Sequence, residues 1–280
     1  MNQADKTAFV LGGGGRWGAV EVGMLQALGD AGIQPDLVLG TSIGAFNGAI
    51  IAEEKNASGA TRLAELWSEI AEADLFKGGI FGRMRNVATM KPAIQGNEEL
   101  REILERIHGA QRRIEDLEIP FQCVAASIER TTEHWFESGP LVEAILASAA
   151  IPVLFPPVEI NGEHFYDGGL VNSIPVDRAV KLGATRVFVL QVGRVESDLR
   201  PPDRLHEAAL ISFEIARRHR FTREWVNMPQ EVEVHLLPSG NPVEFDDRRQ
   251  LKWRDTGMTP HLIDGARAAS VAYLEEAGLM

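Results

Sequence analysis

The sequence has little of three features, and each shortage excludes a class of protein. It contains one cysteine, Cys123, so no disulfide can form within the chain and a secreted disulfide scaffold is excluded. It has no uninterrupted apolar run of about 18 residues, so no transmembrane helix is expected. Basic residues are outnumbered, since 28 Lys and Arg stand against 40 Asp and Glu, for a net charge of −12. This balance argues against general nucleic-acid binding, which needs a basic face toward the phosphates.

The N-terminus also lacks the apolar core of a signal peptide, because only residues 8–11 are apolar before a row of glycines begins. The rest is ordinary globular composition, with 45% hydrophobic and 24% charged residues over 280 positions. His, Cys, Asp and Glu do not cluster at metal-ligand spacing, so neither a metal nor another cofactor is expected. We therefore expect a soluble, cytoplasmic protein of enzyme size.

Hydrophobic patterning predicts an α/β fold. Thr7–Leu11 has the pattern of a buried strand, glycines follow, and residues 19–31 carry apolar side chains at helical spacing. The same order of strand, glycine turn and helix returns over residues 36–39, 40–44 and 45–54. Two such units in succession predict a mostly parallel central sheet that is flanked by helices on both faces.

The remaining chain predicts further elements without a linker between them. The expected helices are residues 61–71, 97–108, 141–150, 203–225 and 259–278, and the expected strands are 121–127, 134–136, 164–166, 186–192 and 232–237. We expect residues 1–200 to form the main α/β domain. Residues 201–280 are expected to be a C-terminal helical extension that packs on the same domain.

Gly40-Thr41-Ser42-Ile43-Gly44 is a GxSxG motif between a predicted strand and a predicted helix. A serine at such a corner adopts crowded backbone dihedral angles, and small residues two positions away on either side relieve the clash. The helix that begins there directs its first N–H groups and the positive end of its dipole toward the serine oxygen. This placement favours a nucleophilic Ser42 over a serine in an ordinary glycine turn.

A glycine-rich loop, residues 12–18, follows the first predicted strand. Consecutive glycines let backbone N–H groups point into a pocket, which suits an oxyanion or a phosphate. Gly13, Gly15 and Gly18 also satisfy GxGxxG, so a dinucleotide-binding turn is the alternative. That alternative needs an acid at the end of the second strand, whereas Asp36 lies at its beginning. We therefore interpret the loop as an oxyanion hole.

A serine nucleophile needs a base, which is usually a histidine. None of the histidines lies in an obvious loop at a strand end; those considered are His206, His219, His235 and His261. Asp167 is the better candidate, because it follows a short predicted strand and the next two residues, Gly168 and Gly169, leave its surroundings open. The same residues also fit an ordinary Asp-Gly turn.

Together these motifs resemble, in content and order, the patatin-like phospholipase family. The matching stretches are Gly13-Gly14-Gly15 with Gly18, Gly40-Thr41-Ser42-Ile43-Gly44, residues 147–152, residues 155–158, Asp167-Gly168-Gly169, Asn172 and Pro175. The resemblance covers about residues 7–192. Each motif is common alone, but their combination is specific. It implies a modified α/β-hydrolase sandwich, with residues 1–200 as the patatin-like catalytic domain.

The resemblance also implies a Ser-Asp dyad that works without histidine. Ser42 corresponds to the nucleophile and Asp167 to the base, while the backbone amides of Gly13, Gly14 and Gly15 correspond to the oxyanion hole. The glycines that support these motifs are Gly18, Gly40, Gly44, Gly168 and Gly169.

One position departs from the family pattern. The pattern places a basic residue directly before the last glycine of the loop, whereas this sequence has Trp17 there and Arg16 one position earlier. The backbone amides survive this change, but a role for the basic side chain is not carried over.

The implied activity is that of a serine lipid acyl hydrolase of the phospholipase A or lysophospholipase type, acting through an acyl-enzyme. The expected substrates are phospholipids, lysophospholipids or other acyl-ester lipids, and any contact with a membrane surface would be peripheral. Two alternatives stay open: an acyltransferase with the same dyad, and a dinucleotide-binding module that uses residues 13–18. The sequence leaves the oligomeric state open.

Residues 75–95 form an unusual stretch, in which basic and apolar residues alternate and no acid occurs. In a chain of net charge −12 such a stretch fits a cover over the acyl channel or a contact with anionic headgroups. It fits an ordinary loop packed on the core equally well.

Overall fold

The computed structural model describes residues 5–54, 58–72, 93, 96–192, 201–202, 231–240 and 259–280, with nine further positions between 208 and 222. The segment 75–95 therefore lies outside the described residues except at Ala93, and so does most of the helix expected over residues 203–225. Within the described part no helix is both long enough and apolar enough to cross a bilayer.

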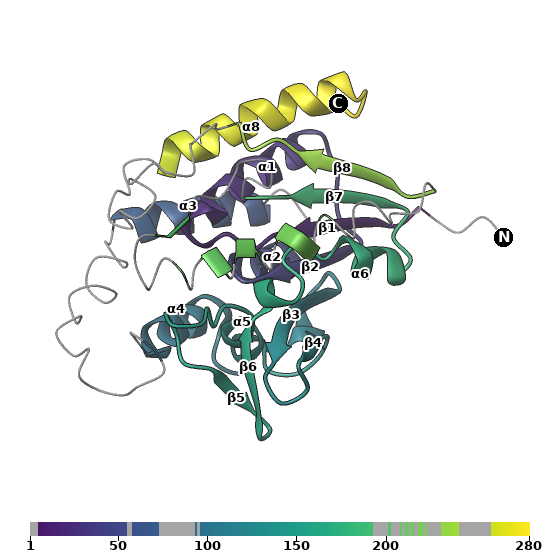
Figure 1. Ribbon diagram of the computed structural model, residues 1–280. Coiled ribbons are helices and arrows are strands. Elements are labelled where there is room, and N and C mark those ends of the chain that lie inside the picture. Colours follow the sequence, from purple (N-terminus) through teal and green to yellow (C-terminus); the bar gives the residue numbers. More distant parts are fainter. Residues whose placement is uncertain are drawn as a thin grey trace.

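The predicted α/β fold is confirmed, with a mostly parallel central sheet flanked by helices (Figure 1). The strands are β1 (Thr7–Leu11), β2 (Leu37–Thr41), β3 (Phe121–Ser127), β4 (Thr132–Phe136), β5 (Val158–Ile160), β6 (Glu163–Asp167), β7 (Arg186–Leu190) and β8 (Glu233–Leu237). Their order is β5-β6-β3-β2-β1-β7-β8, and β4 pairs with β3 outside this path. Neighbours from β3 to β8 run parallel, while β4 and β6 run antiparallel to β3.

Helices cover both faces of the sheet. They are α1 (Gly18–Asp30), α2 (Ile43–Glu53), α3 (Ser58–Glu72), α4 (Glu98–His108), α5 (Leu141–Ser148), α6 (Val176–Lys181) and α8 (Thr259–Glu276), with short 3₁₀ turns η1 (Gly15–Trp17), η3 (Ile114–Asp116) and η4 (Gly168–Leu170). The sequence-based analysis missed β5 and α6. Both are short, with three and six residues, and so they carry too few periods for a pattern to be distinguished.

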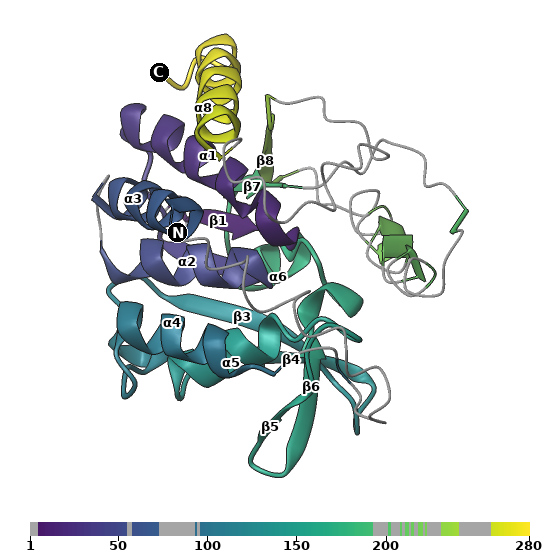
Figure 2. The same ribbon diagram turned by 90° about the vertical axis from the view of Figure 1, so that its left-hand side faces the viewer.

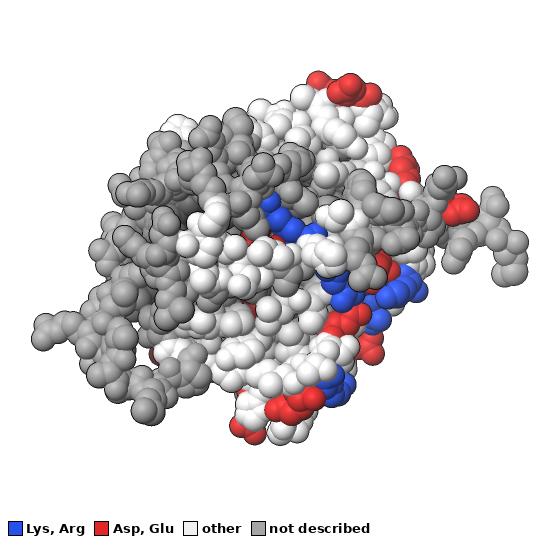
Figure 3. Space-filling model, in the orientation of Figure 1, with Lys and Arg blue, Asp and Glu red and all other residues white. Residues whose placement is uncertain are grey.

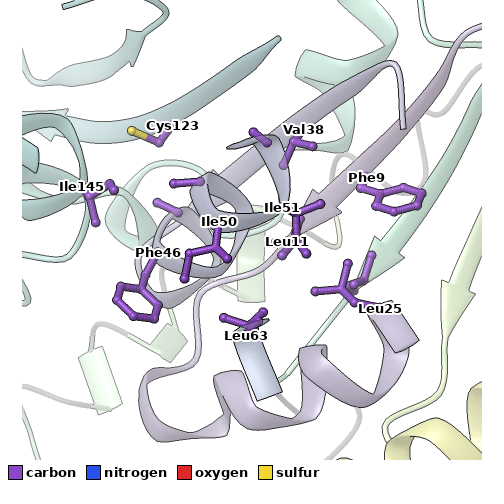
Figure 4. Close-up of a cluster of buried hydrophobic side chains, with 14 of the residues drawn as sticks. Phe9, Leu11, Leu25, Val38, Phe46, Ile50, Ile51, Leu63, Cys123 and Ile145 are labelled. Atoms are coloured by element: carbon purple, nitrogen blue, oxygen red, sulfur yellow. The ribbon is translucent and has the colours of Figure 1, made fainter. Parts of the chain in front are cut away.

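The core follows from the alternation of side chains along β1. Phe9 and Leu11 lie in the larger apolar cluster with α1, α2 and α3, whereas Ala8 and Val10 lie in a second cluster that includes residues of α6. Figure 4 shows the larger cluster, where side chains from the sheet meet those of the helices. Cys123 lies in it fully buried, and this burial raises the pKa of its thiol.

The C-terminal residues join the sheet as well as covering it. β8 pairs in parallel with β7, and α8 lies along α1 (Figure 2). The two helices approach closely at Gly23, where an added Cβ would lie 2.1 Å from the carbonyl oxygen of Ile263. Arg267 on α8 is paired with Asp30 at the end of α1, at 2.8 Å. Residues 201–280 therefore contribute an edge strand in addition to a helix.

Candidate active site

Ser42 lies at the corner between β2 and α2 in a strained backbone conformation. Its φ of 56° and ψ of −121° are dihedral angles that a non-glycine residue rarely adopts. The flanking glycines are required by contact, because a Cβ on Gly40 would lie 2.5 Å from Ala45 Cα and one on Gly44 would lie 2.3 Å from Leu11 O. The corner therefore has the geometry of a nucleophile elbow.

The glycine loop passes directly beside this serine. A Cβ built on Gly13 would lie 3.4 Å from the Cβ of Ser42, so the absence of a side chain there keeps the space next to the serine clear. The loop also packs against the elbow at Gly44, where an added Cβ would come within 2.8 Å of Gly12 O. The glycine loop and Ser42 are thus adjacent, and Gly13 places no side chain between them.

Asp167 ends β6 and is almost fully buried, at 1% exposure. Its backbone N–H donates to Ala150 O at 2.9 Å, and its Oδ1 accepts from the N–H of Gly169 at 2.7 Å. Gly168 lies against β3, where an added Cβ would be 2.2 Å from Val124 O. The Asp-Gly-Gly turn is therefore packed tightly against the sheet rather than lying on the surface as a common turn would.

The sheet brings Ser42 and Asp167 to the same place. β4 occupies one edge of β3 along residues 123–127, so β2 and β6 must share the other edge. On that edge Thr41 pairs with Val124, and Asp167 pairs with the next residue, Ala125. Since β2 and β6 run in opposite directions, their carboxyl ends meet there, separated along β3 by about 3.3 Å, the rise of one residue.

The loop after Asp167 connects all three motifs. The hydroxyl of Thr41 donates to the backbone oxygen of Asn172 at 2.9 Å, and the N–H of Gly13 donates to the backbone oxygen of Ser173 at 3.0 Å. Residues that are far apart in sequence are thereby fixed relative to one another by buried hydrogen bonds. The amide of Gly13 is engaged in this arrangement.

Ser148 is a residue whose place at the site the sequence-based analysis missed. It ends α5, is fully buried, and its Oγ accepts the backbone N–H of Ser42 at 3.0 Å. It lies in the stretch 147–152 that supports the family resemblance, but the sequence alone did not indicate its hydrogen bond to Ser42. Ser148 thus satisfies an amide that the strained elbow would otherwise leave buried without an acceptor.

Replacement of Ser148 by alanine is expected to destabilise the protein by about 1–3 kcal/mol, because the buried amide of Ser42 loses its acceptor. Since that amide belongs to the elbow, kcat of any reaction that uses the Ser42 hydroxyl should fall as well. The matched control is Ser270→Ala on α8, which removes another fully buried hydroxyl, one that donates to Pro238 O. Urea unfolding and kcat of both variants would be compared. A similar loss of stability with an unchanged kcat in both would contradict the expectation for Ser148.

A buried polar network lies behind the glycine loop, and the sequence-based analysis missed it too. Glu21 on α1 is fully buried, and its Oε2 accepts from Asn47 Nδ2 of α2 at 2.7 Å. Asn47 also binds Gly18 O at 3.0 Å and the Nε1–H of Trp67 at 3.0 Å. Burial raises the pKa of Glu21 well above its usual value, although hydrogen bonds from Asn47 and the Gly12 backbone oppose the shift. A glutamate within an apolar helix is the only sequence signal for this network.

Replacement of Glu21 by glutamine is expected to remove a pH dependence of stability. The native state keeps the carboxyl protonated at pH values where the unfolded chain, with a pKa of about 4.3, has released the proton. The contribution of this group is complete below that pKa and falls as the pH rises toward the native pKa. Over this interval, the free energy of unfolding of the variant should rise relative to that of wild type by about 1.4 kcal/mol for each pH unit of increase. Urea unfolding at a series of pH values measures the difference.

Glu53 provides a control of opposite sign. Burial alone would raise its pKa, but hydrogen bonds and charge from His108 and Arg62 outweigh burial and lower it. The loss of stability in Glu53→Gln, relative to wild type, should therefore be largest near neutral pH. It should shrink as the pH falls through the native pKa of Glu53. If the Glu21→Gln difference did not change with pH, a neutral carboxyl in the native state would be ruled out.

Two of the other candidate residues, His235 and Asp36, lie away from this place. His235 is on β8, three strand spacings or roughly 14 Å from β2, where it stacks on Phe188 with ring centroids 4.8 Å apart. His261 is on α8, and His206 lies outside the described residues. Asp36 is at the amino end of β2, where its Oδ2 accepts from the N–H of Thr7 at 2.8 Å.

Comparison with known proteins gives consistent matches. The sequence model described as patatin-like phospholipase matches residues 9–180. The mouse patatin-like phospholipase domain-containing protein 7 is 33% identical over 209 residues, which are 71% of this chain and 14% of that protein. Lysophospholipase nte1 of Aspergillus terreus is 32% identical over 194 residues, which are 68% of this chain and 12% of that protein. The chain thus spans only a small part of the length of these relatives.

Among solved structures, the crystal structure of VipD from Legionella pneumophila aligns with a TM-score of 0.46 and 13% identity. The alignment covers 98% of this chain and 67% of that chain. The family match extends over more than half of the sequence and contains the elbow, the glycine loop and the Asp-Gly-Gly turn. The chain therefore belongs to the patatin-like phospholipase family.

Proposed function

We propose that this chain is a serine lipid acyl hydrolase of the phospholipase A or lysophospholipase type. The observation that carries the proposal is the meeting of β2 and β6 on one edge of β3, which brings Ser42 and Asp167 together beside a loop of glycines. A nucleophile, a carboxylate and backbone amides in mutual reach are the groups that acyl transfer requires.

In the proposed mechanism Ser42 Oγ attacks the ester carbonyl carbon while Asp167 accepts the hydroxyl proton. The negative charge that forms on the carbonyl oxygen is stabilised by N–H groups of the glycine loop and by the positive end of the α2 dipole. The intermediate then collapses, the alcohol leaves with the proton from Asp167, and an acyl-enzyme remains. Water attacks this ester in the same way, which releases the fatty acid and restores Ser42.

The hydrogen bonds of the loop narrow the choice of oxyanion donors. Gly13 was expected to contribute its amide with Gly14 and Gly15, but the N–H of Gly13 donates to Ser173 O in this conformation. We therefore assign the oxyanion hole to the amides of Gly14 and Gly15, and assign to Gly13 the role of leaving space beside Ser42. Each such donor typically contributes a factor of about 10²–10³ in kcat.

The substrate class follows from the relatives, which are named as phospholipases and a lysophospholipase. Phospholipids, lysophospholipids or other acyl-ester lipids are accordingly the proposed substrates, with peripheral contact between the protein and the membrane surface. On the face shown in Figure 3, the described basic side chains are interspersed with acidic ones. Lys181 and Asp177 are one pair of opposite charge among the described residues, at 2.9 Å. The described residues on this face therefore form no continuous basic field of the kind that binds nucleic acid.

The dinucleotide alternative is disfavoured by the place of Asp36. The acid that would hold the ribose hydroxyls is needed at the carboxyl end of β2, whereas Asp36 binds the backbone at the opposite end of that strand. The acyltransferase alternative uses the same site and differs only in whether water or an acceptor alcohol takes the acyl group. Product analysis with and without an added acceptor alcohol separates these two.

Labelling with a fluorophosphonate, followed by peptide mapping, tests the proposal together with release of fatty acid from phosphatidylcholine and lysophosphatidylcholine micelles. We expect modification of Ser42 alone, and fatty acid release that labelling abolishes. Tight binding of a nicotinamide dinucleotide without any labelling would support the dinucleotide module instead and would contradict the hydrolase.

A further inference from the structure

Three helices contribute to the network of Glu21, Asn47 and Trp67 behind the glycine loop. The carboxamide of Asn47 is saturated: Nδ2 donates to Gly18 O and to Glu21 Oε2, and Oδ1 accepts the indole N–H of Trp67. Glu21 and Asn47 are fully buried and Trp67 is 4% exposed. The network therefore has one hydrogen-bonded arrangement, in which the amide of Asn47 cannot be reversed without breaking it.

This network reaches the end of the loop that leads into α1. Asn47 holds the carbonyl of Gly18 at that end. At the other end, the N–H groups of Gly12 and Gly13 donate to Leu190 O and Ser173 O, both at 3.0 Å. Between these ends lie consecutive glycines, which have no side chains to anchor them and whose backbone is intrinsically flexible. Fixing both ends restricts the conformations that the intervening amides can adopt.

Folding stability alone does not account for the polar residues of this network. A buried carboxyl is costly, and Glu21 Oε1 has no hydrogen-bond partner among the described residues. Apolar residues of similar shape at such positions are often neutral or stabilising. Stability therefore does not explain a carboxyl here, whereas a directed hydrogen bond that orients Asn47 toward Gly18 O of the loop does, because only a polar group can make it.

We propose that Asn47 is a positioning residue that holds the α1 end of the glycine loop and that Glu21 is a positioning residue that orients Asn47, so that the loop amides stay directed at the oxyanion formed on Ser42. Trp67 acts through Asn47 by fixing the orientation of its carboxamide. This inference rests on the proposed hydrolase function. Donors that are already in place do not need to reorganise as charge develops, and their displacement by about 1 Å can lower the rate by about 10²-fold.

The test compares Glu21→Leu, which cannot hydrogen bond, with Glu21→Gln, which keeps the shape and an acceptor oxygen. Leucine is expected to lower kcat by about 10- to 100-fold with KM unchanged, and glutamine is expected to restore most of the rate. The inhibition constant of a trifluoromethyl ketone, which forms an oxyanion on the nucleophilic serine, should rise by the same factor as kcat/KM falls. The affinity for a non-reactive ether lipid should not change.

Leu28→Ala on the same helix is the control, because Leu28 is fully buried and has no hydrogen bond to the loop. It should lower the unfolding temperature and leave kcat and the ketone inhibition constant unchanged at a temperature where the protein is folded. Trp67→Phe is the second variant if Glu21→Leu does not fold. It removes the indole donor together with one ring of the side chain, and we expect a smaller fall in kcat with a rise in the ketone constant by the same smaller factor.

The proposal is overturned if Glu21→Leu or Trp67→Phe keeps the kcat and the ketone constant of the wild type. It is also overturned if Leu28→Ala loses kcat in parallel with them. Failure of the hydrolase function itself gives a different result, because wild type would then neither bind the ketone nor depend on Ser42.

Discussion

Replacement of Ser42 by alanine is expected to lower kcat for ester hydrolysis by a factor on the order of 10⁴ or more, because no atom remains to form the acyl-enzyme. The fold should be unaffected. The backbone N–H that Ser148 accepts, and the carbonyl that accepts from Ala45 at 2.9 Å, are both retained in alanine. Fatty acid release and fluorophosphonate labelling measure the loss, and the unfolding temperature reports whether the protein is intact.

Ser173→Ala is the matched control for this prediction. Ser173 is also buried beside the glycine loop, and its Oγ lies 3.5 Å from the position of a Cβ on Gly13. It is therefore another hydroxyl close to the glycine loop, at Gly13. The Ser173→Ala protein should still be labelled at Ser42. If labelling were lost in Ser173→Ala and retained in Ser42→Ala, the nucleophile would be Ser173, and the assignment to Ser42 would be wrong.

Asp167→Asn is expected to lower kcat by about 10³- to 10⁴-fold, because the amide cannot accept the proton of Ser42. This variant removes the proton acceptor and keeps the hydrogen bonds that hold the turn in place. Asn keeps the Oδ1 that accepts from Gly169 N–H, and the backbone hydrogen bond to Ala150 O does not change. The measurements are kcat with a saturating lysophospholipid, the rate of fluorophosphonate labelling and the unfolding temperature.

Asp177→Asn makes the same chemical change at a nearby residue that the mechanism does not use. Asp177 accepts from Asn172 at 2.9 Å and pairs with Lys181 at 2.9 Å, so the variant should lose stability. Its kcat should stay close to that of wild type. Substantial turnover in Asp167→Asn at neutral pH would show that a different group takes the proton, and the Ser-Asp dyad would have to be abandoned.

Local rules predicted the sharp turn at Ser42 and the position of the glycine loop. The elbow at Ser42 and the glycine loop each combine a buried strand, a row of small residues and a helix, all within about 15 consecutive positions. The angles at Ser42 and the close contacts at Gly40 and Gly44 are the physical counterparts of that pattern. A short segment is sufficient because the constraint is a steric one between neighbours along the chain.

The role of Asp167 could not be derived in the same way. Its turn has the sequence of an ordinary Asp-Gly turn, and only the resemblance to a family indicated more. What makes it different is that β6 lies antiparallel on the same edge of β3 as β2. Strand order depends on the packing of the whole sheet, since β4 has to occupy the other edge of β3 for this to happen.

By itself the sequence determined the fold class, the elbow and the glycine loop, because strand and helix periods and glycine turns are properties of consecutive residues. Only the tertiary structure decided three matters: that β6, which ends at Asp167, meets the end of β2, which leads to Ser42; that the amide of Gly13 is engaged by Ser173; and that Glu21 lies buried behind the loop. Each of these depends on hydrogen bonds or burial between segments that lie far apart in the chain or on different helices. Such contacts arise from how elements pack, and they leave no periodic signal in the segments that make them.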